Sequence, residues 1–89
     1  MRLHWFTLNF FKKMERYTFS QNKKDTKYGG MYEILNAQNQ LCAYSECIFN
    51  INEDVFITQS NNTFIFEDAK IWGGEIWGGE IRGGEIWGG

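Results

Sequence analysis

The 89-residue chain contains no proline, a single histidine and only two cysteines. One histidine leaves no convincing Ser-His-Asp or Cys-His arrangement, so we expect no catalytic residues and no enzymatic activity. Cys42 and Cys47 have a spacing that matches no common zinc signature, and His4 lies far from both in the sequence. We therefore expect two reduced cysteines, with a local disulfide or redox pair as the alternative, and neither a metal nor a cofactor.

Long apolar runs are also missing. The N-terminal apolar stretch is far too short to span a membrane. It is not typical of a secretory signal, because His4 and Asn9 interrupt it and no small-residue cleavage site follows. The glycine doublets near the C-terminus lack the Lys-Ser/Thr pair and the following helix of a phosphate-binding loop. We expect a cytoplasmic protein without a phosphate-binding loop.

Aromatic residues make up 18% of the chain, and this content argues against ordinary disorder. A domain of this length buries only about 60% of its unfolded surface, so its stability margin is thin. Residues 1–30 carry seven Lys or Arg and two acids, a balance of +5. Residues 31–89 carry two and nine, a balance of −7. Composition divides the chain into three segments, 1–30, 31–68 and 69–89.

Residues 1–30 form a basic, aromatic N-terminal segment that ends in a polar linker. Spacings of three and four place five apolar side chains on one helical face: Leu3, Phe6, Phe10, Met14 and Tyr17. We expect a short α-helical or irregular segment. Contact of residues 1–17 with a membrane surface or nucleic acid is one interpretation. We favour a helix that caps the β region, or upstream sequence included by an incorrect start, and expect neither of those partners.

Residues 31–68 contain short β-prone runs separated by turn-forming Asn, Asp, Gln and Ser. Their spacing predicts successive strands at 31–35, 41–44, 47–51, 55–58 and 63–66. Either an antiparallel meander or irregular opening coils of a repeat structure fits this pattern. Because a polar stretch leads into a short apolar tip four times between Asn52 and Trp77, we favour the opening coils.

Residues 69–89 consist of four five-residue units, AKIWG, GEIWG, GEIRG and GEIWG, and a final glycine. A period of five fits neither a helix nor a continuous strand, since both would scatter the isoleucines over different faces. A corner at each glycine doublet brings the isoleucines to one side. Four such corners would make one square coil.

The repeat therefore predicts an inward-facing core and an outward-facing surface. The proposed core residues are Ala69, Ile71, Gly74, Ile76, Gly79, Ile81, Gly84 and Ile86. The proposed surface residues are Trp72, Trp77, Arg82 and Trp87. The expected fold is mainly β: a short parallel, β-helix-like β-solenoid, preceded by the α-helical or irregular N-terminal segment.

The unit resembles that of the pentapeptide-repeat proteins: a small residue, Asn or Asp, a central Leu or Phe, a polar residue and often Gly. Residues 69–73 match the small first position, the apolar centre and the closing glycine, and residues 74–78 add an acidic second position. The unit departs in having Glu for Asn or Asp, Gly for Ala, and Trp for the small polar residue. Residues 68–73 are also similar to units of bacterial and phage proteins with hexapeptide-like left-handed β-helices. Both resemblances imply a solenoid over about a quarter of the chain.

One coil is not expected to fold alone, since burying four isoleucines recovers less free energy than ordering twenty residues costs. It needs stacked neighbours, and no lysine or proline after Lys70 protects its edge. We therefore expect a structural protein that self-associates through its C-terminal edge, or a fragment of a longer array.

Two other functions are open at this point. Some pentapeptide-repeat proteins resemble DNA and bind DNA-handling proteins, and the resemblance implies that the acidic part of this chain is such a module. A fragment of a hexapeptide-repeat acyltransferase is the second, although such enzymes usually rely on a histidine within the solenoid and His4 is misplaced for that role. Glu75, Glu80 and Glu85 are expected on different faces, where they would not form a catalytic carboxylate pair.

Overall fold

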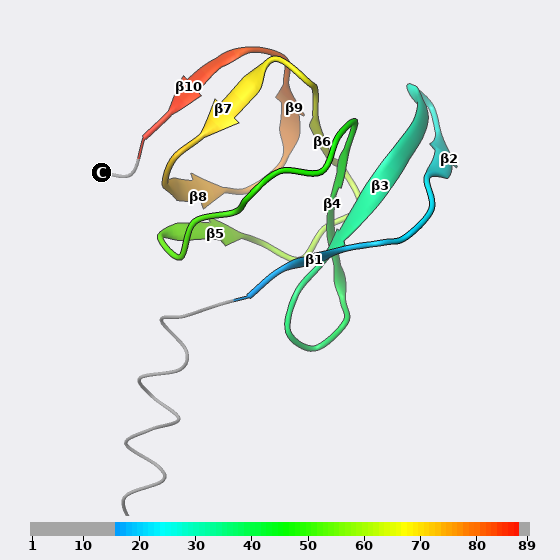
Figure 1. The fold of residues 1–89 in the computed structure, drawn as a ribbon, viewed down its shortest axis with the longest axis horizontal. Coiled ribbons are helices and arrows are strands. Elements are labelled where there is room, and N and C mark those ends of the chain that lie inside the picture. Colours follow the sequence, from blue (N-terminus) through cyan, green and yellow to red (C-terminus); the bar gives the residue numbers. More distant parts are fainter. Residues whose placement is uncertain (1–15, 88–89) are drawn as a thin grey trace, which may run out of the picture.

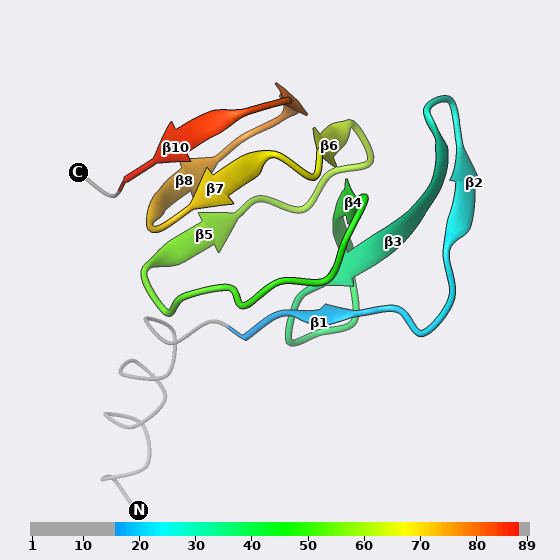
Figure 2. The same cartoon turned by 45° about the horizontal axis from the view of Figure 1, so that its top comes forward.

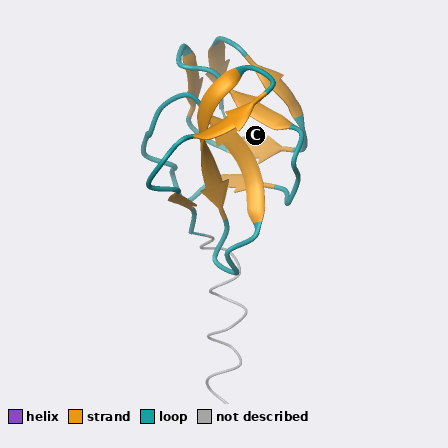
Figure 3. Ribbon diagram, turned by 90° about the vertical axis from the view of Figure 1, so that its right-hand side faces the viewer, coloured by secondary structure: helices purple, strands orange, loops and turns teal. Residues whose placement is uncertain are grey.

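The chain folds into short strands joined by loops, as the computed structural model shows for residues 16–87 (Figure 1). The strands are β1 (Thr18–Phe19), β2 (Lys24–Thr26), β3 (Gly29–Leu35), β4 (Leu41–Ser45), β5 (Val55–Ile57), β6 (Thr63–Ile65), β7 (Ala69–Ile71), β8 (Gly74–Ile76), β9 (Gly79–Ile81) and β10 (Gly84–Ile86). No helix occurs among residues 16–87 (Figure 3). Most of the helical pattern expected within residues 1–30 lies outside the described range. The linker expected at the end of that segment is wrong, because residues 24–26 form β2 and β3 begins at Gly29.

Strands β1 to β4 are joined by antiparallel pairing. β3 pairs with β1, β2 and β4, and β3 and β4 form a hairpin. The hairpin loop is held by Asn36, whose Oδ1 accepts hydrogen bonds from the Gln38 and Gln40 amides, both at 2.9 Å. Asn39 in the same loop has a φ of 63°, which asparagine tolerates better than most residues. Local turn chemistry therefore sets this part of the fold.

The later strands wrap around in parallel pairs (Figures 1 and 2). β5 pairs with β8, β6 with β9, and β7 with β10. In each pair one isoleucine lies beside another: Ile57 and Ile76, Ile65 and Ile81, Ile71 and Ile86. β4 also pairs in parallel with β6, so one six-stranded sheet contains both kinds of pairing. We call β5 to β10 the wrap, and this sheet joins the wrap to the antiparallel strands.

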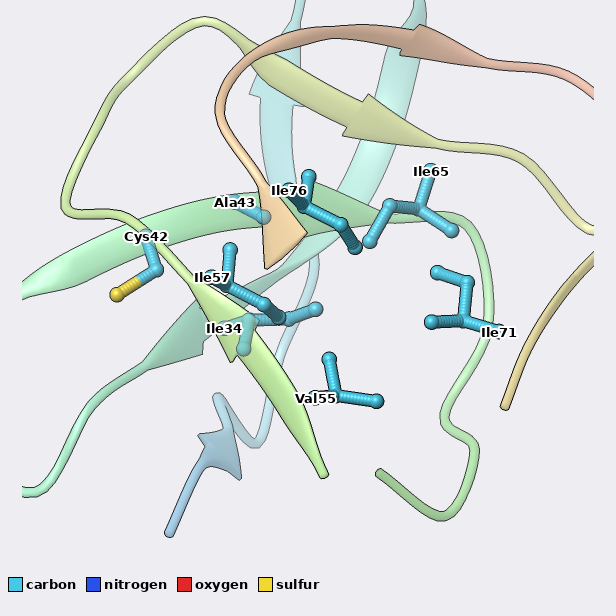
Figure 4. Close-up of a cluster of buried hydrophobic side chains, with 8 residues drawn as sticks. All are labelled: Ile34, Cys42, Ala43, Val55, Ile57, Ile65, Ile71 and Ile76. Carbon is cyan, nitrogen blue, oxygen red and sulfur yellow. The ribbon is translucent and has the colours of Figure 1, made fainter. Parts of the chain in front are cut away.

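The core lies where the wrap meets the β3–β4 hairpin (Figure 4). Its buried side chains come from both parts of the chain: Ile34, Cys42, Ala43, Val55, Ile57, Ile65, Ile71 and Ile76. Ile81 and Ile86 pack against this cluster but are only partly buried. Burial of apolar area is the dominant stabilising term, so the first turn of the wrap, β5 to β7, is stabilised more by packing than β9 and β10 at its end.

Four of the five strands predicted between residues 31 and 68 are confirmed as β3, β4, β5 and β6. The strand predicted at 47–51 is wrong, because this segment is a loop in which Ile48 is 60% exposed. Ser45 ends β4 and prevents its continuation: its Oγ accepts a hydrogen bond from the Cys47 amide and donates one to the Cys47 carbonyl.

The predicted fold class, a short parallel β-solenoid, is wrong. The described chain is a compact β globule with mixed sheets, because β1 to β4 pair antiparallel while β4, β6 and β9 pair in parallel. β3 and β4 are the longest strands and are joined by a short loop, a combination that favours a local hairpin over a long parallel crossover. The two topologies considered for residues 31–68 each describe only part of the sheet.

The square coil predicted for the repeat is wrong as well. Gly84 lies beside Ala69, three units earlier, so the chain returns to the same side after three units and not four. Each corner is formed by a glycine with positive φ: Gly74 at 94°, Gly79 at 93° and Gly84 at 81°. The bend at each corner determines how many units complete one turn, and a period of five leaves that bend unspecified.

Candidate interaction surface

Each repeat unit from residue 74 onward points its glutamate, and the residue two positions later, away from the core. Side chains alternate along a strand, so the isoleucine between them points inward. The outward pairs are Glu75–Trp77, Glu80–Arg82 and Glu85–Trp87. In each pair the tryptophan Nε1 or arginine Nε donates a hydrogen bond to the glutamate Oε1, at 2.9, 2.9 and 3.1 Å in that order. Each unit therefore orients its own outward side chain.

Parallel pairing brings outward aromatic side chains of neighbouring strands together. The rings of Trp72 and Trp87 stack with centroids 5.4 Å apart and an interplanar angle of 22°. The rings of Phe56 and Trp77 lie 5.7 Å apart and are tilted. These four side chains are 37% to 66% exposed. Grouped apolar exposure of this kind is typical of an interaction surface.

Arg82 lies on the side of the wrap that is formed by β6 and β9. Its Cζ is 4.3 Å from the ring centroid of Phe66 and 5.3 Å from that of Tyr28. Lys27 Nζ lies 5.3 Å from the ring centroids of Tyr28 and Phe64. A cation over an aromatic ring contributes about 0.5–1 kcal/mol at an exposed site. The one departure from Trp in the repeat therefore falls where aromatic rings accept a cation.

Among the described residues, β8, β9 and β10 are paired along one side only. The carbonyls of their isoleucines accept hydrogen bonds from the preceding turn of the wrap: Thr58 N to Ile76 O at 3.0 Å, Phe66 N to Ile81 O at 2.9 Å, and Trp72 N to Ile86 O at 2.7 Å. Successive residues of a strand direct their N–H and C=O groups to opposite sides. The flanking glutamates therefore direct theirs to the unpaired side. We call this side the open edge; β10 lies at the top of Figure 2.

The opposite end of the wrap is covered. The Tyr17 hydroxyl accepts a hydrogen bond from the Ile57 amide at 2.9 Å and donates one to the Ile57 carbonyl at 3.4 Å. These groups lie on the side of β5 that faces away from β8, since the next amide, that of Thr58, bonds to β8. Phe19 and Phe49 pack edge to face beside this contact, with ring centroids 5.4 Å apart.

The loop between β4 and β5 covers the same end beside β7. Its Glu46 Oε1 accepts a hydrogen bond from the Glu67 amide at 2.8 Å. Asn52 Nδ2 donates to the Trp72 carbonyl at 3.0 Å. Side chains from outside the repeat therefore satisfy backbone groups at this end. We call it the closed end.

Two hollows flank the Trp72 ring. The larger, of about 960 Å³, is lined by Asn52, Asp54, Phe56, Trp72, Gly74, Glu75, Ile86 and Trp87. The smaller, of about 290 Å³, lies between the β4–β5 loop and β7 and includes Cys47 and Lys70. Within residues 16–87 no cluster of three or more His, Cys, Asp or Glu could hold a metal ion. Both cysteines are thiols.

The proposed core residues differ in burial along the repeat. Ile71 and Ile76 are 6% and 4% exposed. Four more are partly buried: Ala69, Gly74, Ile81 and Ile86. Gly79 and Gly84 are exposed, and a Cβ added to either would meet no atom within 4 Å. A shortage of space is therefore not what requires glycine at these two positions; positive φ is.

The proposed surface residues are all exposed. Trp72, Trp77 and Trp87 are 43%, 66% and 65% exposed, and the Arg82 side chain is 59% exposed. The structure divides them between three sides of the wrap, with Trp72 and Trp87 on one side.

Sequence reasoning missed two kinds of residue. The first is the set of rings around Arg82, Tyr28 and Phe66, which come from segments considered a linker and a separate strand. The exceptional Arg82 was itself the available signal, because a cation among tryptophans indicates a different neighbour. The second is Tyr17, which was included in a helical pattern although it contacts Ile57 across the fold.

Comparison with protein-family models, with curated proteins and with solved structures finds no match for this chain. Within residues 16–87 there is no helix with the length and apolar content needed to cross a membrane. The resemblance to pentapeptide-repeat and hexapeptide-like proteins stays a prediction.

Proposed function

We propose that this protein is a structural protein that self-associates through the open edge and has no catalytic role of its own. The observation that carries the proposal is the row of backbone groups on β8, β9 and β10 that no strand within residues 16–87 pairs with, beside the half-buried Ile81 and Ile86. An unpaired edge is a template for another chain. Pairing there would complete the hydrogen bonding and remove both isoleucines from water.

The alternatives have less support. The acidic-module hypothesis needs an unbroken negative surface, whereas Glu80 forms an ion pair with Arg82 and Lys27 lies against the neighbouring rings. The acyltransferase hypothesis depends on His4, which lies outside the described residues. A cytoplasmic location is part of the proposal.

The proposal can be tested by sedimentation velocity over a concentration series. We expect the intact chain to sediment faster as concentration rises, and Ile81→Lys, which places a charge at the half-buried end of the core, to stay monomeric. Ile48→Lys is the matched control, because Ile48 is 60% exposed in a loop away from the open edge, and it should behave like the intact chain. Circular dichroism establishes whether each variant is folded.

Hydrogen exchange tests the same idea without a substitution. The amides of Glu75, Glu80 and Glu85 point to the open edge, so their exchange should slow as concentration rises. The amide of Thr58, which is already bonded to Ile76, should change little. A chain that stays monomeric at all concentrations, with a folded and protease-resistant C-terminal region, would refute self-association.

A further inference from the structure

The backbone groups of the open edge have a fixed alternation. The amide of Gly79 bonds to the Asn62 carbonyl at 3.1 Å and the carbonyl of Ile81 accepts from Phe66, so residues 79 and 81 face the preceding turn. Glu80, inside β9, therefore presents its N–H and C=O groups to the open edge, and the Arg82 N–H, which belongs to the same peptide as the Ile81 carbonyl, faces the same way. The five-residue period gives the same arrangement at Glu75 and Trp77 in the β8 unit, and at Glu85 and Trp87 in the β10 unit.

We propose that the open edge pairs with the open edge of a second copy of this chain, antiparallel, around a two-fold axis that passes through Ile81. This inference rests on the proposed self-association and specifies its partner, symmetry and register. With the axis at Ile81, Glu80 lies opposite Arg82 of the second copy, and Arg82 opposite Glu80 of the second copy. In each pair the Arg82 amide faces the Glu80 carbonyl of the other copy, and the Ile81 pair lies between the two pairs.

Charge decides this register over its neighbours. Opposite charges directly across an antiparallel pair stabilise it, whereas like charges destabilise it. A shift that keeps the same hydrogen-bonding alternation places Glu80 opposite Glu80 of the second copy, or Arg82 opposite Arg82. The Ile81-centred register avoids both contacts and forms a cluster of two carboxylates and two guanidinium groups. Within each copy Glu80 and Arg82 are already oriented by a 2.9 Å contact.

The period of five extends the match to the other two sides. The rotation that places Ile81 on Ile81 also places Ile76 opposite Ile86 of the second copy, and the reverse. Glu75 then lies opposite Trp87, and Trp77 opposite Glu85, of the second copy. Every outward glutamate of the open edge therefore meets an indole N–H or a guanidinium group, the same two donors that it contacts within its own chain.

Arg82 occupies the one unit where the axis passes, and there a strand meets its own copy. The positive charge makes that self-pairing complementary. The two-fold symmetry therefore explains why Arg82 lies in the middle one of the last three units. The rings of Phe66 and Tyr28 give a second reason.

The closed end limits this assembly to a dimer. Head-to-tail stacking would need the open edge to meet the opposite edge of β5, where the Tyr17 hydroxyl already bonds to Ile57. Two open edges that meet around a two-fold axis cover each other, and such an interface closes without further growth.

Disulfide cross-linking of the 89-residue chain tests the register. Directly opposite residues in a hydrogen-bonded antiparallel pair have Cα atoms about 5.5 Å apart, within disulfide range. In a Cys47→Ser background, which leaves only the buried Cys42, we expect cross-linked dimers when Glu80→Cys and Arg82→Cys chains are mixed and oxidised. In that mixed dimer the second Glu80–Arg82 contact is retained. Glu80→Cys alone should cross-link at least tenfold less, and so should Arg82→Cys alone.

Charge exchange provides the second measurement. Arg82→Glu should weaken dimerisation at least tenfold, and Glu80→Arg combined with Arg82→Glu should restore it to within about threefold of the intact chain. Circular dichroism of the double variant shows whether it is folded.

The outcomes separate the two proposals. An intact chain that never associates refutes both the proposed function and the register. Association with cross-linking of Glu80→Cys alone, with growth beyond dimers, or without rescue by the double variant overturns the two-fold register and leaves self-association standing.

Discussion

The two ends of the wrap are built from the same kind of parallel strand but completed differently. At the closed end, β5 is covered by Tyr17, and Ile57 is 2% exposed. At the open edge, β10 has no strand beyond it among residues 16–87, and Ile86 is only partly buried. A repeat provides identical layers, whereas covering a terminal layer needs a different sequence. At the closed end the covering residues, such as Tyr17, come before the repeat in the chain.

The largest expected difference between the ends is the cost of deleting a core side chain. Ile57→Ala should lower the free energy of unfolding by about 2–5 kcal/mol, because it removes a fully buried side chain and leaves a cavity. Ile86→Ala should cost about 1 kcal/mol, because less apolar area is lost from a half-exposed position. Urea unfolding at a protein concentration below the onset of association gives both values. If Ile57→Ala does not fold, Ile57→Val should still cost about 0.5–1.5 kcal/mol. Equal costs for the two alanine variants would contradict the comparison.

The Tyr17 hydroxyl provides the second contrast. Tyr17→Phe keeps the ring but leaves the Ile57 amide at the closed end without its partner, which should cost about 1–2 kcal/mol. Tyr44→Phe is the control, because in the described part of the chain no hydrogen bond involves the Tyr44 hydroxyl. Both can be measured by urea unfolding, and the Ile57 amide should exchange faster in the Tyr17 variant alone. A Tyr17→Phe variant as stable as the control would mean that the closed end does not depend on this contact.

The smallest expected difference in stability is between alanine substitutions at two adjacent glycines near the open edge, Gly83 and Gly84. Gly84 has a φ of 81° and Gly83 lies outside the left-handed region, while an added Cβ at either would meet no atom within 4 Å. Gly84→Ala should therefore destabilise the fold by about 1 kcal/mol. Gly83→Ala should be neutral, or stabilising by up to about 1 kcal/mol, since it reduces the freedom of the unfolded chain. Thermal unfolding of the pair measures the difference, and identical shifts would show that backbone conformation is not what requires Gly84.

The sequence was informative where the signal is local. The period of five predicts that Ile71 and Ile76 face inward, because the alternation within each unit and the corner at each glycine doublet are properties of the unit itself. The turn residues around Asn36 likewise indicate a break between two strands, and the structure has a hairpin there.

The number of repeat units in one turn and the mixed pairing of the sheet could not be predicted from the sequence. The number of units in one turn depends on the bend at each corner, so the neighbour of Gly84 could not be read from the repeat. The mixed sheet depends on β4, which pairs antiparallel with β3 and in parallel with β6. Nothing in residues 41–45 distinguishes a strand with two such neighbours from one with a single partner.

The in-register isoleucines of the wrap also affect how the chain finds its fold. A slip of the later strands by one five-residue unit would still place isoleucine beside isoleucine, so the interior hardly distinguishes the two alignments. The outward-facing side chains do distinguish them, because a slip would move Arg82 away from the rings of Phe66 and Tyr28. The contact of Arg82 with these rings therefore favours the native alignment over a slipped one. A gene that gained or lost one unit between Phe66 and Arg82 would still place isoleucine beside isoleucine but would move Arg82 away from these rings.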